Sequence, residues 1–129
     1  MAEMIRVLLV EKSQDEAAAV VAQLQKAGYE VFSVVAEDAE KMKMALDRQG
    51  WNVVICGTDL PRFDWQRALK MAREVDPEVP FILISKVFDE KDVAQAMKAG
   101  VNAYLTKDHL AGLPLAVAGE LSDSLLRRE

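Results

Sequence analysis

The sequence predicts an α/β domain built on a doubly wound parallel β-sheet with helices on both faces. Short β-branched runs alternate five times with longer segments of helical period, as in chains of consecutive βα units. The first run, IRVLLV at 5–10, is continuously apolar, which is typical of a central strand covered on both faces. The chain has 129 residues, which is too short for the eight units of a closed barrel.

The first predicted unit begins with this strand. Ser13 and, three residues later, Glu16 then form a capping box that opens a helix. Gly28 ends the helix, because glycine adopts the left-handed conformation of a helix cap at low cost. The residues predicted to face the core share helical spacing: Ala17, Val20, Val21, Leu24 and Ala27.

The second and third units repeat the pattern. A strand at 29–35 leads to a helix over about 38–48, and a short strand at 53–56 leads into a loop that contains Pro61. Asp64 is placed to cap the next helix. The predicted inward residues are Ala39, Met42 and Leu46 in the second helix, and Trp65, Ala68, Leu69, Ala72 and Val75 in the third.

The last two units complete the predicted sheet. A strand at 81–85 leads to a helix that Asp89 opens and Gly100 closes, and a fifth strand covers 103–106. The final helix starts at Leu110 or Pro114 and runs to about Arg127. The predicted inward residues are Val93, Ala96 and Met97 in the fourth helix, and Leu110, Leu113, Val117 and Leu121 in the fifth.

Five strands favour the flavodoxin-like order 2-1-3-4-5, in three α/β/α layers. The sequence stops while its last segment, LSDSLLRRE, still has helical character. We therefore expect residues 1–129 to form a single domain that was excised from, or lies at the N-terminus of, a larger protein.

Composition excludes several classes of protein. The chain is 51% hydrophobic, which argues against disorder, and it contains no stretch near the roughly 20 apolar residues of a membrane span. Its 16 basic and 21 acidic residues give a net charge of −5, which disfavours nucleic-acid binding by this domain alone. The single cysteine, Cys56, forbids an intrachain disulfide and favours a reducing compartment. We expect a cytoplasmic domain that binds no membrane.

Polar residues follow four of the five predicted strands. In open α/β sheets the ligand crevice lies beyond the carboxyl ends of the strands, so these residues should converge on one small pocket. They are Glu11 and Lys12 after the first strand, Gly57, Thr58 and Asp59 after the third, Ser85 and Lys86 after the fourth, and Lys107 and Asp108 after the fifth.

The segments VLLVEKS, VVICGTDLPRFD, PFILIS and MKAGVNAYLTKD, with the final helix, resemble a receiver domain of two-component (phosphorelay) signalling. The resemblance covers the whole chain and implies a signalling module that is not an enzyme. It also implies a partner: another signalling protein, or a covalently linked sensory or output domain. The partner surface would be the face formed by the fourth helix, fifth strand and fifth helix. A homodimer is a further candidate assembly.

The family's phosphorylation site is only half retained. The acceptor aspartate lies four residues before the loop proline, which places it at Gly57. The acidic pair after the first strand falls on Glu11 and Lys12. The family holds Mg²⁺ through the second acid, the acceptor and a backbone carbonyl two residues further, here Lys12, Gly57 and Asp59. Two carboxylate ligands are therefore missing, and we expect Mg²⁺ binding to be lost or weak and no other cofactor to bind.

Other family positions are kept. Ser85 matches the hydroxyl that contacts the phosphoryl group, Lys107 matches the phosphate-pairing lysine, and Tyr104 matches the aromatic switch residue. The resemblance thus predicts a pseudo-receiver that acts by protein–protein interaction. The alternative is a phosphorylatable receiver whose acceptor has moved to Asp59. Gly57 also suits a tight strand-to-loop exit, and this interpretation stays open.

The lysines and Cys56 also have structural interpretations. We expect Lys12 to reach toward Asp59 or Glu11, and Lys107 to pair with one of the same two acids. Cys56 is expected to be a small core residue. A flavodoxin-like oxidoreductase is rejected, because the first strand is followed by EKSQDE rather than a Ser/Thr/Gly-rich phosphate cradle.

Overall fold

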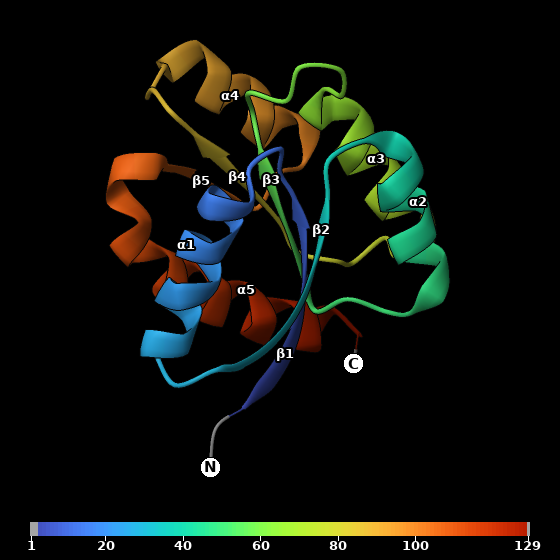
Figure 1. The fold of residues 1–129 in the computed structure, drawn as a ribbon, viewed down its shortest axis with the longest axis vertical. Coiled ribbons are helices and arrows are strands. Elements are labelled where there is room, and N and C mark those ends of the chain that lie inside the picture. Colours follow the sequence, from blue (N-terminus) through green and yellow to red (C-terminus); the bar gives the residue numbers. More distant parts are fainter. Residues whose placement is uncertain (1–2, 129) are drawn as a thin grey trace.

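The computed structural model describes residues 3–128, and the side chains of residues 3–124. Strands and helices alternate along the chain (Figure 1). They are β1 (Met4–Val10), α1 (Gln14–Lys26), β2 (Glu30–Ala36), α2 (Ala39–Arg48), β3 (Val53–Gly57), α3 (Trp65–Val75), β4 (Phe81–Ser85), α4 (Glu90–Ala99), β5 (Ala103–Thr106), the 3₁₀ helix η1 (Lys107–Gly112) and α5 (Leu113–Arg128). No helix in this part of the chain is both long enough and apolar enough to cross a membrane.

The five strands form one parallel sheet in the order β2-β1-β3-β4-β5, which confirms the predicted topology. Helices α1 and α5 cover one face, and α2, α3 and α4 cover the other (Figure 1). The register of the central pair matches Val7 with Val53 and Val10 with Cys56. From β1 the chain adds β2 on one side of the sheet and β3 on the other. The carboxyl ends of β1 and β3 therefore border the crevice at the topological switch point.

The core consists of two layers, one on each side of the sheet. Because alternate residues of a strand face opposite sides, Val7 and Leu9 of β1 pack under α1 and α5, whereas Leu8 and Val10 pack under α2 and α3. Phe81 at the start of β4 is among the largest fully buried side chains. The continuous apolar runs of the sequence are therefore explained by burial on both faces.

The predicted helix caps are confirmed. Ser13 Oγ accepts from Glu16 N at 3.2 Å, Asp64 Oδ1 accepts from Arg67 N at 2.8 Å, and Asp89 Oδ1 accepts from Lys91 N at 2.8 Å. Gly28 follows α1 with a φ of 100°, and Gly100 caps α4 with a φ of 106°. Each of these residues does what its type predicts at a helix terminus.

Three residues that were predicted to face the core are exposed instead. Val75 is 55% exposed at the last position of α3, and Met97 is 49% exposed on α4. Ala27 is also exposed, because it follows the last residue of α1 as its C-cap. Near a helix end the spacing of apolar residues continues beyond the sheet that they would cover, so periodicity alone overestimates burial there.

Of the two predicted starts of the final helix, Leu110 and Pro114, the second agrees with the structure to within one residue. Residues 107–112 form the 3₁₀ helix η1, in which His109 has non-helical angles (φ −125°, ψ 33°), and α5 begins at Leu113. Pro114 thus occupies the first turn of α5, where a missing N–H removes no intrahelical hydrogen bond.

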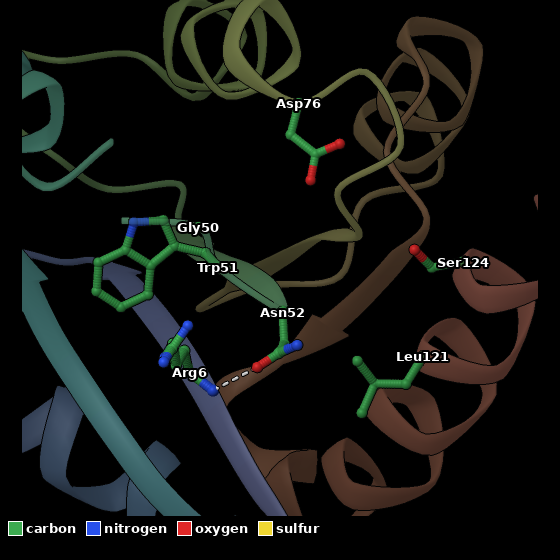
Figure 2. A pocket seen from close by; sticks show the side chains of 7 residues that line it. All are labelled: Arg6, Gly50, Trp51, Asn52, Asp76, Leu121 and Ser124. Carbon is green, nitrogen blue, oxygen red and sulfur yellow. Dashed lines mark hydrogen bonds between the residues drawn. The ribbon is translucent and has the colours of Figure 1, made fainter. Parts of the chain in front are cut away.

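The amino ends of the strands border a cavity of about 370 Å³ (Figure 2). Hydrogen bonds from side chains to the backbone hold this end together. Asn52 Oδ1 accepts from Arg6 N at 2.7 Å, and Asn102 Oδ1 accepts from Phe81 N at 2.8 Å. Ser124 Oγ of α5 donates to Glu78 O at 3.2 Å. These contacts satisfy backbone groups in the first half of β1, at the start of β4 and in the loop before β4.

Candidate functional site

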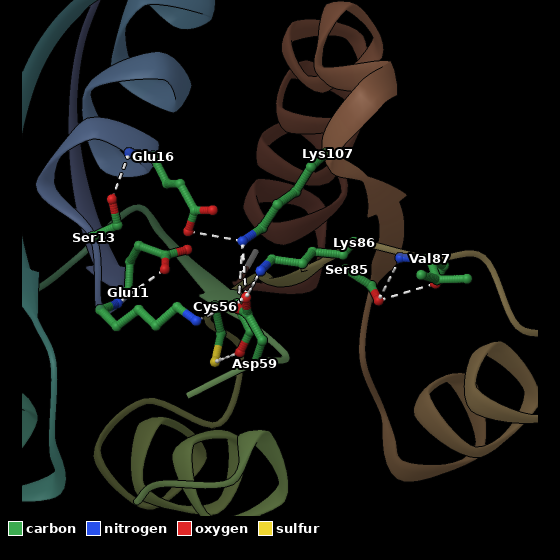
Figure 3. A network of polar contacts seen from close by, with 11 residues as sticks. Glu11, Ser13, Glu16, Cys56, Asp59, Ser85, Lys86, Val87 and Lys107 are labelled. Carbon is green, nitrogen blue, oxygen red and sulfur yellow. Dashed lines mark hydrogen bonds and ion pairs between the residues drawn. The ribbon is translucent and has the colours of Figure 1, made fainter. Parts of the chain in front are cut away.

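The polar residues beyond the strands converge, as predicted, at the carboxyl end of the sheet (Figure 3). Asp59, in the loop after β3, lies at the centre of the cluster. Its Oδ2 atom is 3.2 Å from Lys12 Nζ, 3.3 Å from Lys86 Nζ and 3.3 Å from Lys107 Nζ. One carboxylate oxygen therefore contacts ammonium groups from three different loops. The expected approach of Lys12 and Lys107 to Asp59 is confirmed.

The surroundings of Asp59 favour its charged form. Burial by itself raises the pKa of this carboxyl, but hydrogen bonds from Lys12 and Lys86 and the charge of Lys107 outweigh burial. The net result lowers the pKa of Asp59 to about 2. Asp59 is thus an anion at every physiological pH.

Two further carboxylates, Glu11 and Glu16, lie beside Lys107. Lys107 Nζ is 2.8 Å from Glu16 Oε2, an ion pair that was not predicted and that Lys107 makes in addition to its predicted contact with Asp59. The side chains of Glu11 and Glu16 are hydrogen-bonded to each other. Glu11 is only 7% exposed, and its Oε1 accepts from Lys12 N at 2.9 Å.

Burial, followed by the hydrogen bond to Glu16, raises the pKa of Glu11. The hydrogen bond from Lys107 and that from Glu11 lower the pKa of Glu16. When Glu11 is protonated, it is therefore the donor in the bond between the two acids. The sequence suggested Glu16 only as a capping residue. Its place in the first turn of α1, directly above the crevice, was the signal that could have indicated this second role.

The site contains three ammonium groups and three carboxylates, so with all six ionised its formal charge is zero. Glu11, Glu16 and Asp59 each offer an oxygen, and these atoms lie within 4.8 Å of one another, a spacing at which carboxylates can share a metal ion. Asp59 and Glu16 are in contact with Lys12, Lys86 or Lys107, however, and these cations already supply compensating charge.

Gly57, the last residue of β3, has a φ outside the positive range, unlike Gly28 and Gly100. Gly57 therefore lies at the strand-to-loop exit, as expected, but without a positive φ. A Cβ atom at this position would lie 2.8 Å from Glu11 Oε2 and 3.4 Å from Asp59 Oδ1. The missing side chain, rather than backbone freedom, thus distinguishes this position, and the carboxylate of Glu11 fills part of the space.

Ser85 and Tyr104 form a separate group beside the ion cluster. Ser85 Oγ donates to Val87 O at 3.0 Å and accepts from Val87 N at 3.4 Å, and Tyr104 Oη donates to the same carbonyl at 3.4 Å. The ring of Phe88 packs edge-on against Tyr104, with 6.5 Å between the centroids. Both polar side chains therefore contact the loop after β4, and Ser85 turns away from Asp59 (Figure 3).

In the part of the chain that the structure describes, Cys56 and His109 are the other side chains whose chemistry could serve a site, and both make only local polar contacts. Cys56 is fully buried, as expected, and its thiol donates to Gly57 O at 3.3 Å. Burial raises the pKa of this thiol far above its usual range, so the reactive thiolate does not form. His109 is exposed in η1, where its Nδ1 lies 2.9 Å from Thr106 Oγ1 and 3.2 Å from Asp108 Oδ1.

Comparison with known proteins supports the resemblance noted in the sequence. The profile of the response regulator receiver domain matches residues 7–115. An uncharacterized transcriptional regulatory protein from Bacillus subtilis (strain 168), YvcP, is 33% identical over 104 residues. That alignment covers 81% of this chain and 43% of the relative, so the chain spans less than half of the relative's length.

Solved structures share the fold. A CheY-like receiver domain protein from Methanospirillum hungatei JF-1 superposes with a TM-score of 0.80 at 19% identity, covering 97% of this chain and 99% of that one. The receiver domain of sensor histidine kinase PA1611 from Pseudomonas aeruginosa PAO1, which has a magnesium ion in its active site cleft, gives a TM-score of 0.75 at 24% identity and covers 92% and 98%. From the profile match, the chain belongs to the response regulator receiver domain family of two-component signalling.

Proposed function

We propose that this receiver domain transmits signals by protein–protein interaction and without aspartyl phosphorylation. The observation that carries the proposal is Gly57. On the family's pattern this residue stands at the acceptor position, and it offers no carboxylate to phosphorylate. Glu11 Oε2 lies 2.8 Å from the position that a Cβ atom of residue 57 would occupy.

The charges of the crevice favour the same proposal. A magnesium ion prefers several oxygen ligands and little positive charge nearby. Lys12 stands where the family has a metal-binding acid, and its Nζ is 3.2 Å from Asp59. A divalent ion would have to displace this ammonium and that of Lys86 from the same oxygen. We therefore propose that the residues present do not suit Mg²⁺.

The proposed partner surface is the face of α4, β5 and α5. Val87 and Phe88, in the loop before α4, are 69% and 62% exposed, and Met97 of α4 is half exposed. Apolar side chains this exposed, two of them adjacent in the sequence, are typical of interaction sites. The partner is another signalling protein, or a sensory or output domain of a longer chain in which residues 1–129 form a single cytoplasmic domain. A second copy of the chain is the other candidate occupant.

The alternative function is phosphorylation of Asp59. It requires a free carboxylate oxygen in line with the leaving oxygen of the phosphodonor, and a bound metal ion that neutralises the charge of the phosphoryl group. Asp59 is ionised, which suits a nucleophile, but its Oδ2 is surrounded by three ammonium groups. We regard this alternative as the weaker one.

The two functions are separated by incubating the protein with acetyl phosphate and Mg²⁺ and measuring its intact mass. We expect no mass increase, while a receiver with an acceptor aspartate gains one phosphoryl group under the same conditions. A gain of one phosphoryl group that Asp59→Asn abolishes would establish the alternative. A gain that persists in Asp59→Asn would also overturn the proposal, because another residue would then accept phosphate.

A further inference from the structure

We infer that Asp59 is a resident anion that occupies an oxyanion site formed by Lys12, Lys86 and Lys107, and that its occupancy holds the loop at 86–89 in place. The inference rests on the proposed function and deepens it, because it names the contact that would hold the loop at 86–89 in one conformation without phosphorylation. The chemical class that suits the site is a small oxyanion, a carboxylate or a phosphate.

The geometry of the three lysines supports an anion site rather than chance surface pairing. Their Nζ atoms come from the loops after β1, β4 and β5, yet all lie within 3.3 Å of one oxygen. Lys107 is also within 3.4 Å of the second oxygen, Asp59 Oδ1. Ammonium groups repel one another, so three of them gather only around a compensating negative charge. With the loop of Asp59 itself, the contact joins four loops at one atom.

Lys86 links this contact to the exposed loop. It precedes Val87, whose carbonyl accepts from both Ser85 and Tyr104, and Phe88, whose ring packs on Tyr104. The Lys86 side chain is 57% exposed, so its stem is not held by packing and its ion pair with Asp59 restrains it. Removing the anion should therefore release the residues that present Val87 and Phe88.

Chymotrypsin cleavage after Phe88 measures this release, because the enzyme cuts beside aromatic residues in mobile segments. We expect Asp59→Ala to raise the cleavage rate at Phe88 by about fivefold, as for the loss of partly exposed ion pairs. Mass spectrometry identifies the cleaved bond, and circular dichroism confirms that the variant is folded. The matched control is Asp47→Ala on the exposed face of α2, which makes the same change in charge and should leave the rate unchanged.

Chemical rescue then tests the anion site directly. Acetate or inorganic phosphate at millimolar concentration should return Asp59→Ala toward the wild-type rate, whereas sodium chloride at matched ionic strength should not. Asp59→Asn should show the same faster cleavage with less rescue, because its amide fills the space that the added anion needs. This second variant also serves if Asp59→Ala does not fold.

An unchanged cleavage rate in the folded variants would overturn the inference, and so would equal rescue by chloride. The assay contains neither magnesium nor a phosphodonor. Its failure is therefore distinct from failure of the proposed function, which depends on whether the wild-type protein gains phosphate.

Discussion

The two ends of the sheet are built from different kinds of contact. At the carboxyl end, long charged side chains from separate loops contact one another around Asp59. At the amino end, Asn52, Asn102 and Ser124 bond to backbone groups of distant segments. The ion pairs are partly exposed and so regain water when they are broken, whereas the N–H of the buried Phe81 does not when it loses its acceptor. We therefore expect the contacts at the amino end to contribute more to stability than those at the carboxyl end. Charged residues at the carboxyl end can then be substituted at a lower cost in stability.

The largest effect on stability is expected from a substitution at the amino end of the sheet. Asn102→Ala removes the acceptor of Phe81 N at 2.8 Å and of Arg73 Nη2 at 2.7 Å. We expect the free energy of unfolding in urea to fall by about 2 kcal/mol, because a partly buried donor is left without its acceptor. Asn102→Asp keeps an acceptor oxygen and should lose less. A loss in Asn102→Ala no larger than that in Asp59→Ala would contradict the comparison.

A smaller pair of effects, opposite in sign, is expected within the carboxyl end. The raised pKa of Glu11 means that folding disfavours its charged form, so Glu11→Gln should raise the melting temperature at pH 7. The lowered pKa of Glu16 means that folding favours its charged form. Glu16→Gln should therefore lower the free energy of unfolding by about 1 kcal/mol, because the ion pair with Lys107 is lost. Thermal unfolding of both variants checks the signs. If the two changed stability in the same direction, the assignment of donor and acceptor between these acids would be wrong.

The smallest effect is the pH dependence contributed by Asp59. Its pKa is about 2 in the folded protein against an ordinary value of 3.8, so its stabilisation is present above pH 3.8 and is lost as pH falls toward 2. Asp59→Asn should therefore be less stable than the wild type at pH 7, by at most about 1 kcal/mol for a partly exposed group. The difference should shrink in urea titrations at successively lower pH. A difference independent of pH would show that the ion pairs contribute nothing to stability.

Most of the fold follows from local patterns in the sequence. The bounds of β4 and β5 and the caps at Ser13, Asp64 and Asp89 were predicted correctly, because strand runs and capping residues act over a few positions. The exposure of Val75 and Met97 was not predicted. Their burial depends on how far the sheet extends beneath each helix, which is a tertiary property that periodicity does not contain.

The sequence predicted which residues form the site, but not which of them contact one another. Strand ends identified Glu11, Lys12, Asp59 and Lys107, since parallel strands bring their carboxyl ends to one edge. Which lysine meets which acid depends on side-chain torsions, so the contact of Lys107 with Glu16 was missed. The role proposed for Gly57 is tested by the phosphorylation assay described above, and the roles of Ser85 and Tyr104 stay predictions.

The space beside Gly57 has a consequence for how such a domain evolves. On the proposed function, an aspartate restored at 57 would begin 2.8 Å from Glu11 Oε2 and would add a fourth carboxylate to a balanced set of six charges. Lys12 would still hold the place of a metal ligand. On the proposed function, Gly57→Asp alone therefore would not suffice, and phosphorylation would require Lys12→Asp together with Gly57→Asp and a displaced Glu11. Several neighbouring groups would have to change together, so phosphorylation would lie beyond the reach of any one substitution.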